Sequence, residues 1–280
     1  MPVAQGRRVE KPWGRANLPA PFGDPSDRDR SIGEIIFDGD GNESSELLVK
    51  FLFTTEKLSI QVHPDDRLAR SQGLPRGKDE AWIVFDAESG ATIGLGLKET
   101  VSKPVLRQAA LDGSIEALVD WRAAKPGDAY YSPAGAIHAI GPGLSLVEIQ
   151  QNIDVTYRLY DYGRPRELHL DQAIDAVKPE LQIERQIPTV LAPEHLRLAG
   201  GPAFQVEQLS GPASGRLSPH EKEAWLVALA GEGRIGGADI RAGQVWRLDQ
   251  PAYLRLEREA LFILAYPGAE AATVWGPDEG

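Results

Sequence analysis

The sequence contains no cysteine, little positive charge and no long hydrophobic run. Without cysteine there is no disulfide, thiolate nucleophile or iron–sulfur cluster, so any metal must be bound by histidine, carboxylate or amide groups. The 30 Lys and Arg residues are outnumbered by 41 Asp and Glu residues, which argues against a nucleic-acid-binding surface. Apolar runs fall far short of the roughly 20 residues that cross a bilayer, and Met1–Pro12 lacks the apolar core of a signal peptide. We therefore predict a cytoplasmic protein that acts on a small molecule, with no nucleic-acid or membrane partner.

The distribution of glycine and proline indicates the fold class. The 280 residues include 29 Gly and 21 Pro, which separate short β-branched or alternating segments. This rhythm predicts an all-β protein of sandwich or barrel type, long enough for about two domains. Helical patterns are few, and the clearest covers residues 103–118. The predicted domains are residues 1–180, with a helical insert at about residues 98–121, and residues 181–280.

Two pairs of segments resemble each other and suggest an internal repeat. Lys78–Val84 is echoed by Glu221–Val227, and Lys125–Tyr130 is echoed in pattern by Arg241–Trp246. The echo favours two copies of one β-unit over a chance recurrence of Glu-Ala-Trp. The second copy has no Gln-x-His pair and lacks Pro, Gly and His after Gly243. It is predicted to be metal-free and to cover hydrophobic surface of the first copy.

One candidate pair of metal ligands ends an alternating segment. Side chains alternate between the two faces of a strand, so Gln61 and His63 project to the same side. Pro64 then ends the strand, and Asp65 and Asp66 fit the first turn of a helix, where they are expected to cap it. Of these residues, only Gln61 and His63 are predicted ligands.

A second candidate motif has spaced glycine, proline and histidine residues. Gly127, Pro133, Gly135 and His138 have the spacing of a tight turn between two strands that directs an imidazole into a barrel mouth. The spacing resembles the second motif of the cupin family, although Pro142 replaces the Asn that often closes it. The fold is therefore expected to consist of two cupin-type β jelly-roll units.

Several motifs together resemble type I phosphomannose isomerase in its short bacterial form, over about residues 8–170. The order and spacing of Gln-x-His-Pro, Gly-Lys-x-Glu, His, and the later Glu and Arg are specific to that family. The motifs are Lys11–Gly14, Ile32–Glu34, Leu58–Asp66, Gly77–Trp82, Pro133–Gly141, Val147–Gln151 and Tyr157–Asp161.

The resemblance implies a metal-dependent interconversion of mannose 6-phosphate and fructose 6-phosphate, in which a proton moves between C1 and C2 through an enediol(ate). It implies one metal per chain, usually zinc, although manganese and cobalt suit the same ligands. Arg158 is expected near the phosphate, Lys78 as a phosphate ligand or proton carrier, and Glu148 as the base. The implied metal ligands are Gln61, His63, Glu80 and His138.

Other interpretations remain open at this point. The chain fits a non-catalytic sugar-binding or regulatory bicupin, an isomerase of another phosphosugar, or an oxygen-using iron cupin. Ile35–Phe37 follows Gly33-Glu34 where the family commonly has an aromatic residue, so the pocket wall is expected to differ. Instead of acting at the site, Arg158 could pair with Asp161 at the surface, and Glu148 could face solvent. The protein is predicted to be a monomer or homodimer. Residues predicted not to act at the site are His169, His195 and His220, and the packing residues Trp13, Trp82 and Trp225.

Overall fold

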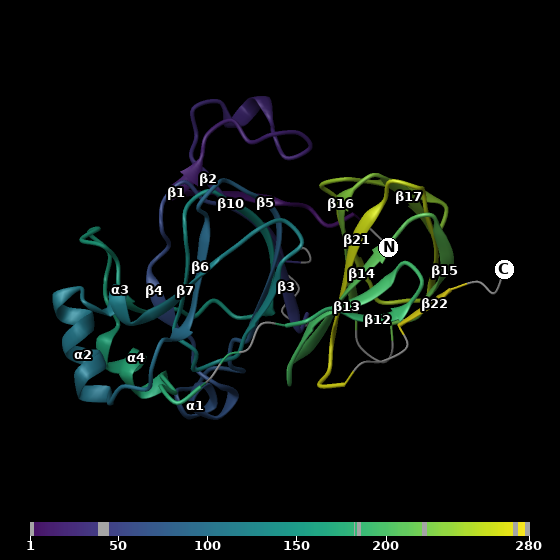
Figure 1. Ribbon diagram of the computed structural model, residues 1–280. Helices are drawn as coiled ribbons and strands as arrows, with labels where there is room; N and C mark the ends of the chain where they lie inside the picture. Colours follow the sequence, from purple (N-terminus) through teal and green to yellow (C-terminus); the bar gives the residue numbers. More distant parts are fainter. Residues whose placement is uncertain are drawn as a thin grey trace.

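The computed structural model describes residues 3–38, 45–181, 183, 186–219, 223–270 and 274–277. These residues form four antiparallel sheets, arranged as two β-sandwich units with few helices (Figure 1). The all-β prediction is confirmed. Among these residues, no helix is long and apolar enough to span a membrane.

The first unit contains a six-stranded and a five-stranded sheet. In spatial order, the larger sheet consists of β1 (Arg7–Arg15), β2 (Ile32–Phe37), β3 (Leu47–Phe53), β10 (Leu144–Gln151), β5 (Glu80–Ala87) and β8 (Ala129–Ser132). The smaller sheet consists of β11 (Tyr157–Tyr160), β4 (Ile60–Val62), β9 (His138–Ile140), β6 (Thr92–Leu97) and β7 (Val119–Ala123).

The second unit has the same topology. Its larger sheet consists of β12 (Thr189–Ala192), β13 (His195–Gly200), β14 (Phe204–Ser210), β21 (Leu261–Pro267), β16 (Ala224–Ala230) and β19 (Val245–Leu248). The smaller sheet consists of β18 (Ala238–Arg241), β17 (Glu232–Ile235), β20 (Ala252–Leu256), β15 (Ala213–Leu217) and β22 (Trp275–Pro277). If eleven is added to each strand number of the first unit, the strand orders of both sheets of the second unit result. The two units are therefore copies of one arrangement.

Among the described residues, the helices belong to the first unit: most lie on its side away from the second unit, whereas the short helix of residues 25–27 lies in the loop at the top of Figure 1. The segment predicted to be helical after Pro64 begins with Asp65, whose carboxylate accepts a hydrogen bond from Leu68 N at 2.8 Å, as expected of an N-cap. The predicted helix over 103–118 is divided at Gly113, whose φ of +83° ends its first part in a left-handed cap. The helices are η1 (Pro25–Asp27), α1 (Asp66–Ser71), α2 (Lys103–Asp112), α3 (Ile115–Leu118) and α4 (Leu170–Ala176).

The echoed Glu-Ala-Trp segments lie on equivalent strands, β5 and β16, but they are out of phase. In β5, Trp82 faces the interior of the first unit and Ala81 faces the second unit. In β16, Ala224 faces the interior of the second unit and Trp225 faces the first unit. Because side chains alternate, a shift of one residue exchanges the faces. The repeat therefore holds for the topology, but the matched letters do not occupy equivalent positions.

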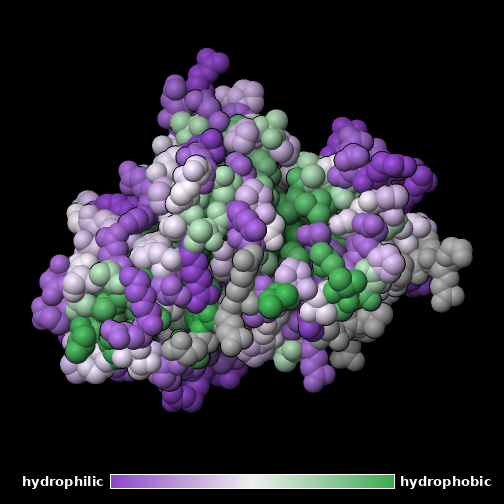
Figure 2. Space-filling model, in the orientation of Figure 1, coloured by the Kyte–Doolittle hydropathy of each residue, from purple (hydrophilic) through white to green (hydrophobic). Residues whose placement is uncertain are grey.

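The two six-stranded sheets pack against each other and bury a shared hydrophobic cluster. Phe51 and Val147 of the first unit lie in one cluster with Phe204, Trp225 and Ile263 of the second, and all are 0% exposed. Hydrophobic residues are also visible along this junction at the surface, whereas the outer rim is mainly hydrophilic (Figure 2). Hydrophobic burial is the main attraction between the two units.

Polar contacts at the junction centre on Glu223, a buried carboxylate just before β16. It accepts hydrogen bonds from Ser45 Oγ at 2.8 Å, Glu46 N at 2.8 Å and Leu47 N at 3.0 Å, all in the first unit. Within its own unit it pairs with Arg247 Nε at 2.6 Å. Glu223 therefore fixes the start of β3 to the second unit.

The Glu223→Ala variant is expected to lower the free energy of unfolding by about 3 kcal/mol, because it leaves the Arg247 charge and several first-unit donors without their acceptor. Urea unfolding measures the change. The control is Glu232→Ala, which removes an exposed carboxylate paired with Arg241 at 3.8 Å and should change stability by less than about 0.5 kcal/mol. Equal losses in the two variants would contradict a specific contribution of Glu223.

Candidate metal centre and substrate pocket

Three predicted ligands from separate strands meet inside the first unit. Ligand atoms of His63, Glu80 and His138 all lie within 4.8 Å of one another, and each residue is at most 2% exposed. His63 follows β4, Glu80 begins β5 and His138 begins β9. The pairing of Gln61 with His138 in the β4–β9 ladder sets the positions of the two histidines. This group can hold a metal ion.

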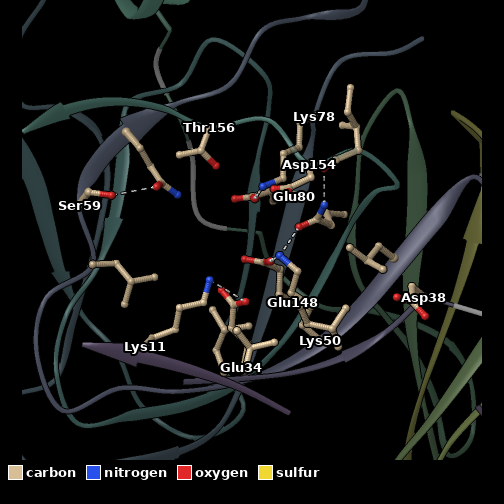
Figure 3. A pocket seen from close by; sticks show the side chains of 18 of the residues that line it. Lys11, Glu34, Asp38, Lys50, Ser59, Lys78, Glu80, Glu148, Asp154 and Thr156 are labelled. Atoms are coloured by element: carbon tan, nitrogen blue, oxygen red, sulfur yellow. Dashed lines mark hydrogen bonds and ion pairs between the residues drawn. The ribbon is translucent and has the colours of Figure 1, made fainter. Parts of the chain in front are cut away.

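The distances within the cluster bring several acceptor atoms together. His63 Nε2 lies 3.1 Å from Glu80 Oε1, and His138 Nε2 lies 3.4 Å from Glu80 Oε2. Gln61 Nε2 lies 3.2 Å from His138 Nε2. Gln61 Oε1 accepts a hydrogen bond from Ser59 Oγ at 3.1 Å, drawn as the dashed line at Ser59 in Figure 3. A half-turn of the Gln61 amide brings Oε1, a suitable ligand atom, to the same position. The fourth predicted ligand thus lies beside the other three.

Hydrogen bonding leaves the ligand atoms available. His138 Nδ1 lies 3.0 Å from the carbonyl oxygen of Ala136, which only accepts, so Nδ1 carries the proton and Nε2 keeps its lone pair. In the described part of the chain, both ring nitrogens of His63 and Glu80 Oε2 are buried without a hydrogen-bond partner. Buried polar atoms without partners are costly. A cation between these atoms would satisfy them, so the residues present fit a metal.

The electrostatics favour ligands in their metal-binding protonation states. Burial, reinforced by the Lys78 ammonium, lowers the pKa of His63 to about 3, and burial also lowers the pKa of His138. Burial opposes ionisation of Glu80, but Lys78 at 2.9 Å and the nearby imidazoles hold the Glu80 pKa well below its usual range. At neutral pH the site therefore offers two neutral imidazoles and one carboxylate.

A cavity of about 380 Å³ adjoins the cluster and is lined by charged side chains from the larger sheet (Figure 3). Lys50 Nζ contacts Glu148 Oε1 at 2.8 Å and Gln150 Oε1 at 2.7 Å. Farther along the sheet, Lys11 Nζ lies 3.2 Å from Glu34 Oε2. The cavity therefore presents both cations and carboxylates to a polar ligand.

The three predicted catalytic residues all line this cavity. Lys78 and Glu148 are each 5% exposed, so the solvent-facing interpretation of Glu148 is wrong. Arg158, on β11, is half-buried opposite Gln61, and its Nε has no hydrogen-bond partner among the described residues. The alternative pairing with Asp161 does not occur.

Asp161 instead binds two other arginines. Its carboxylate pairs with Arg166 at 2.6 Å and with Arg164 at 3.3 Å. Within the described ranges, no carboxylate lies in ion-pair distance of Arg158. The guanidinium of Arg158 is therefore available to a ligand.

Sequence comparison finds relatives of this chain among mannose-6-phosphate isomerases. No family model matches the chain. Mannose-6-phosphate isomerase of Streptococcus mutans is 37% identical over 210 residues, which cover 70% of this chain and 65% of that protein. ManA of Bacillus subtilis, also a mannose-6-phosphate isomerase, is 35% identical over 202 residues, which cover 68% of this chain and 63% of that protein. Over about two thirds of its length, the chain is therefore similar to mannose-6-phosphate isomerases.

Solved structures of the phosphomannose isomerase family have the same fold. The Bacillus subtilis mannose 6-phosphate isomerase matches with a TM-score of 0.82 and 25% identity, over 94% of this chain and 98% of that one. A mannosephosphate isomerase described as putative from Archaeoglobus fulgidus matches with a TM-score of 0.73 and 18% identity, over 95% of this chain and 97% of that one. The sequence matches span slightly less than two thirds of the two relatives compared above.

Lys50 is a residue of this cavity that the sequence interpretation missed. It is the lone charge in the apolar strand Leu47–Phe53, and that isolation is a signal that could have identified it. Burial disfavours its charge, but the carboxylates of Glu148 and Glu34 raise its pKa above the usual value. Lys50 therefore adds a fixed positive charge to the pocket.

His169 and His195 lie outside the metal cluster. His169 Nδ1 accepts a hydrogen bond from the backbone N–H of Arg158 at 3.3 Å, and His195 Nε2 contacts Glu207 at 2.7 Å inside the second unit. His220 lies outside the described residues. The predicted packing residues Trp13, Trp82 and Trp225 are each at most 3% exposed, and Trp13 also lines the cavity.

Proposed function

We propose that this chain is a metal-dependent isomerase that interconverts mannose 6-phosphate and fructose 6-phosphate. The observation that carries the proposal is the buried His63–Glu80–His138 cluster, which adjoins a cavity lined by buried Lys78 and by Arg158, a residue with no ion pair among the described residues. Together they supply a cation site for sugar oxygens and a positive site for phosphate. The similarity to mannose-6-phosphate isomerases supports the same assignment.

The proposed cofactor is one zinc ion per chain, bound in the unit of residues 1–180. When bound, the metal would polarise the sugar oxygens at C1 and C2. Two imidazoles, a carboxylate and an amide suit zinc and leave room for a substrate oxygen. In the described part of residues 181–280 there is no comparable group of ligands, so this unit is proposed to be metal-free. The proposed ligands are Gln61, His63, Glu80 and His138.

Arg158 is proposed to bind the substrate phosphate. Its guanidinium offers several N–H donors in a planar fork that matches phosphate oxygens. Burial, reinforced by the nearby Arg166, lowers the pKa of Arg158, so a second positive charge lies close to the proposed phosphate site. Asp161 pairs with Arg166 and Arg164, and no carboxylate of the described residues lies within ion-pair distance of Arg158, so its guanidinium is available to the phosphate.

Glu148 is proposed to move the proton between the two carbons. It would remove the proton from C2 of open-chain mannose 6-phosphate, while the C2–H electrons form the C1–C2 double bond and O1 gains a proton. The same carboxylate would then return the proton to C1 as the C2 carbonyl forms. Lys50 and Trp82 each donate one hydrogen bond to Glu148, which fixes the carboxylate and leaves each oxygen a further lone pair.

Lys78 is proposed to carry the proton between the two oxygens. When Glu148 moves the proton from C2 to C1, the sugar oxygen O1 must gain a proton and O2 must lose one. Lys78 Nζ lines the cavity and lies 2.9 Å from Glu80 Oε1, which holds the ammonium beside the metal cluster. It is therefore placed next to the oxygens that a metal at this site would bind.

The decisive test is conversion of mannose 6-phosphate to fructose 6-phosphate by the purified protein, before chelation, after chelation and after zinc is restored. Activity should disappear with the metal and return with it, and elemental analysis should give one zinc per chain. Glucose 6-phosphate serves as the alternative substrate. Turnover of only another phosphosugar, or sugar-phosphate binding without turnover by the metal-loaded protein, would overturn the proposed function.

A further inference from the structure

Asp79 lies between two residues of the site but faces the other way. Lys78 and Glu80 line the cavity, whereas the buried carboxylate of Asp79 points to the opposite side of the strand. It accepts a hydrogen bond from Tyr131 Oη at 2.6 Å and another from Ala134 N at 2.8 Å. Asp79 therefore connects the start of β5 to the turn that follows β8.

That turn, residues 133–136, contacts both histidines of the metal cluster. The N–H of Gly135 donates a hydrogen bond to the carbonyl oxygen of His63 at 2.9 Å. The carbonyl of Ala136 accepts the hydrogen bond from His138 Nδ1 at 3.0 Å, which sets the tautomer of that ring. A shift of the turn would consequently move both imidazoles relative to the carboxylate on β5.

The second unit packs on the ring that holds Asp79. Tyr131 is only 4% exposed, and its ring centroid lies 5.2 Å from that of Phe204. Gly201 approaches the ring so closely that a Cβ there would lie 2.1 Å from Tyr131 Cζ. The position therefore requires glycine, and the loop of the second unit fixes the tyrosine.

We propose that the Tyr131–Asp79 pair is a positioning device through which the second unit holds the metal centre of the first. Gly201 and Phe204 fix the tyrosine ring, the tyrosine hydroxyl fixes Asp79, and Asp79 aligns Glu80 with the turn that orients His63 and His138. This inference rests on the metal binding of the proposed function. It gives the metal-free unit a direct contribution to the site.

The test compares Tyr131→Phe with the unchanged protein in a competition titration of Co²⁺ against a chromophoric chelator. The substitution keeps the ring and removes only the hydroxyl, so the protein should fold. Loss of a supporting hydrogen bond typically weakens metal affinity about 10- to 100-fold, and that loss is expected here. The visible absorption bands of bound Co²⁺ should also change, because the ligand geometry relaxes.

The matched control is Tyr130→Phe. Tyr130 is the preceding buried tyrosine, and its hydroxyl makes long contacts of 3.4 Å with Ala123 O and 3.3 Å with Asp128. The Tyr130→Phe variant should bind Co²⁺ with an affinity within about twofold of that of the unchanged protein, because a lost hydrogen bond weakens metal binding only where it supports the ligands. A similar loss in both tyrosine variants would show a general effect of hydroxyl removal and would overturn the proposal.

A second variant approaches the pair from the other unit. Gly201→Ala adds a methyl group against the Tyr131 ring and should also weaken Co²⁺ binding. The control is Gly276→Ala, where the added methyl carbon would lie 3.8 Å from Arg216 O, and it should leave Co²⁺ binding unchanged. Full Co²⁺ affinity and an unchanged spectrum in Tyr131→Phe would overturn the proposal, even with lowered stability. Failure of the proposed function is distinguishable, because it would appear as unchanged protein that binds no metal or does not isomerise.

Discussion

The His138→Ala variant is expected to lose both metal and isomerase activity. The imidazole is 1% exposed, and its Nε2 lies 3.4 Å from Glu80 Oε2 and 3.2 Å from Gln61 Nε2. Removal of a ligand should weaken metal affinity by at least about 100-fold, beyond what loss of a supporting residue usually costs. With the site empty at ordinary zinc concentrations, turnover should fall below about 1% of the original rate.

Metal content and turnover of His138→Ala are best compared with those of His195→Ala. The control removes a buried histidine that contacts Glu207 at 2.7 Å, so it should lower stability by a similar mechanism. It lies in the second unit, away from the cluster, and should retain one metal per chain. Metal retained by His138→Ala would contradict its role as a ligand, and metal lost from both variants would attribute the loss to stability alone.

The Arg158→Ala variant is expected to retain its metal while kcat/KM falls about 100- to 1,000-fold. Binding energy from a remote phosphate helps to position the reacting carbons, so its loss affects kcat as well as KM. The folded protein should be little affected, because Arg158 forms no ion pair in the part of the chain that the structure describes. This combination of normal metal content and low turnover distinguishes the residue from a ligand.

Steady-state kinetics and metal analysis test this expectation, with Arg158→Lys as the conservative variant. Lysine keeps the charge but not the fork of donors, and it should restore part of the lost rate. The matched control is Arg107→Ala on α2, where the arginine pairs with the exposed Asp171 at 2.7 Å and should not affect turnover. A normal rate in Arg158→Ala would disprove the phosphate-binding role.

The strand pattern and the motif spacing together predicted the fold class and the residues that meet at the site. Alternation placed Gln61 and His63 on one face, and the structure places both beside His138. Alternation does not state which face points inward, however. For Glu148 that choice depends on pairing with β3 and β5, where Lys50 and Trp82 become its partners, and such long-range pairing is not encoded in local spacing.

Local spacing also could not predict the ion pairs of β11 and the turn that follows it. Arg158, Arg164 and Arg166 all lie within a few residues of Asp161, so proximity along the chain does not select a partner. The structure pairs Asp161 with Arg166 and Arg164 and leaves Arg158 at the cavity. The choice follows from the direction of each side chain on strand and turn.

The one-residue phase difference between β5 and β16 limits how a second metal site could arise. A carboxylate at position 223 already exists, but it is directed to the junction, where it binds Ser45 and the start of β3. The positions of β16 that face the interior are Ala224, Leu226 and Ala228, and Ala224 begins β16 as Glu80 begins β5. A two-metal protein evolved or engineered on this scaffold would therefore need its new β16 ligand at position 224. Glu223 would keep its hydrogen bonds between the two units.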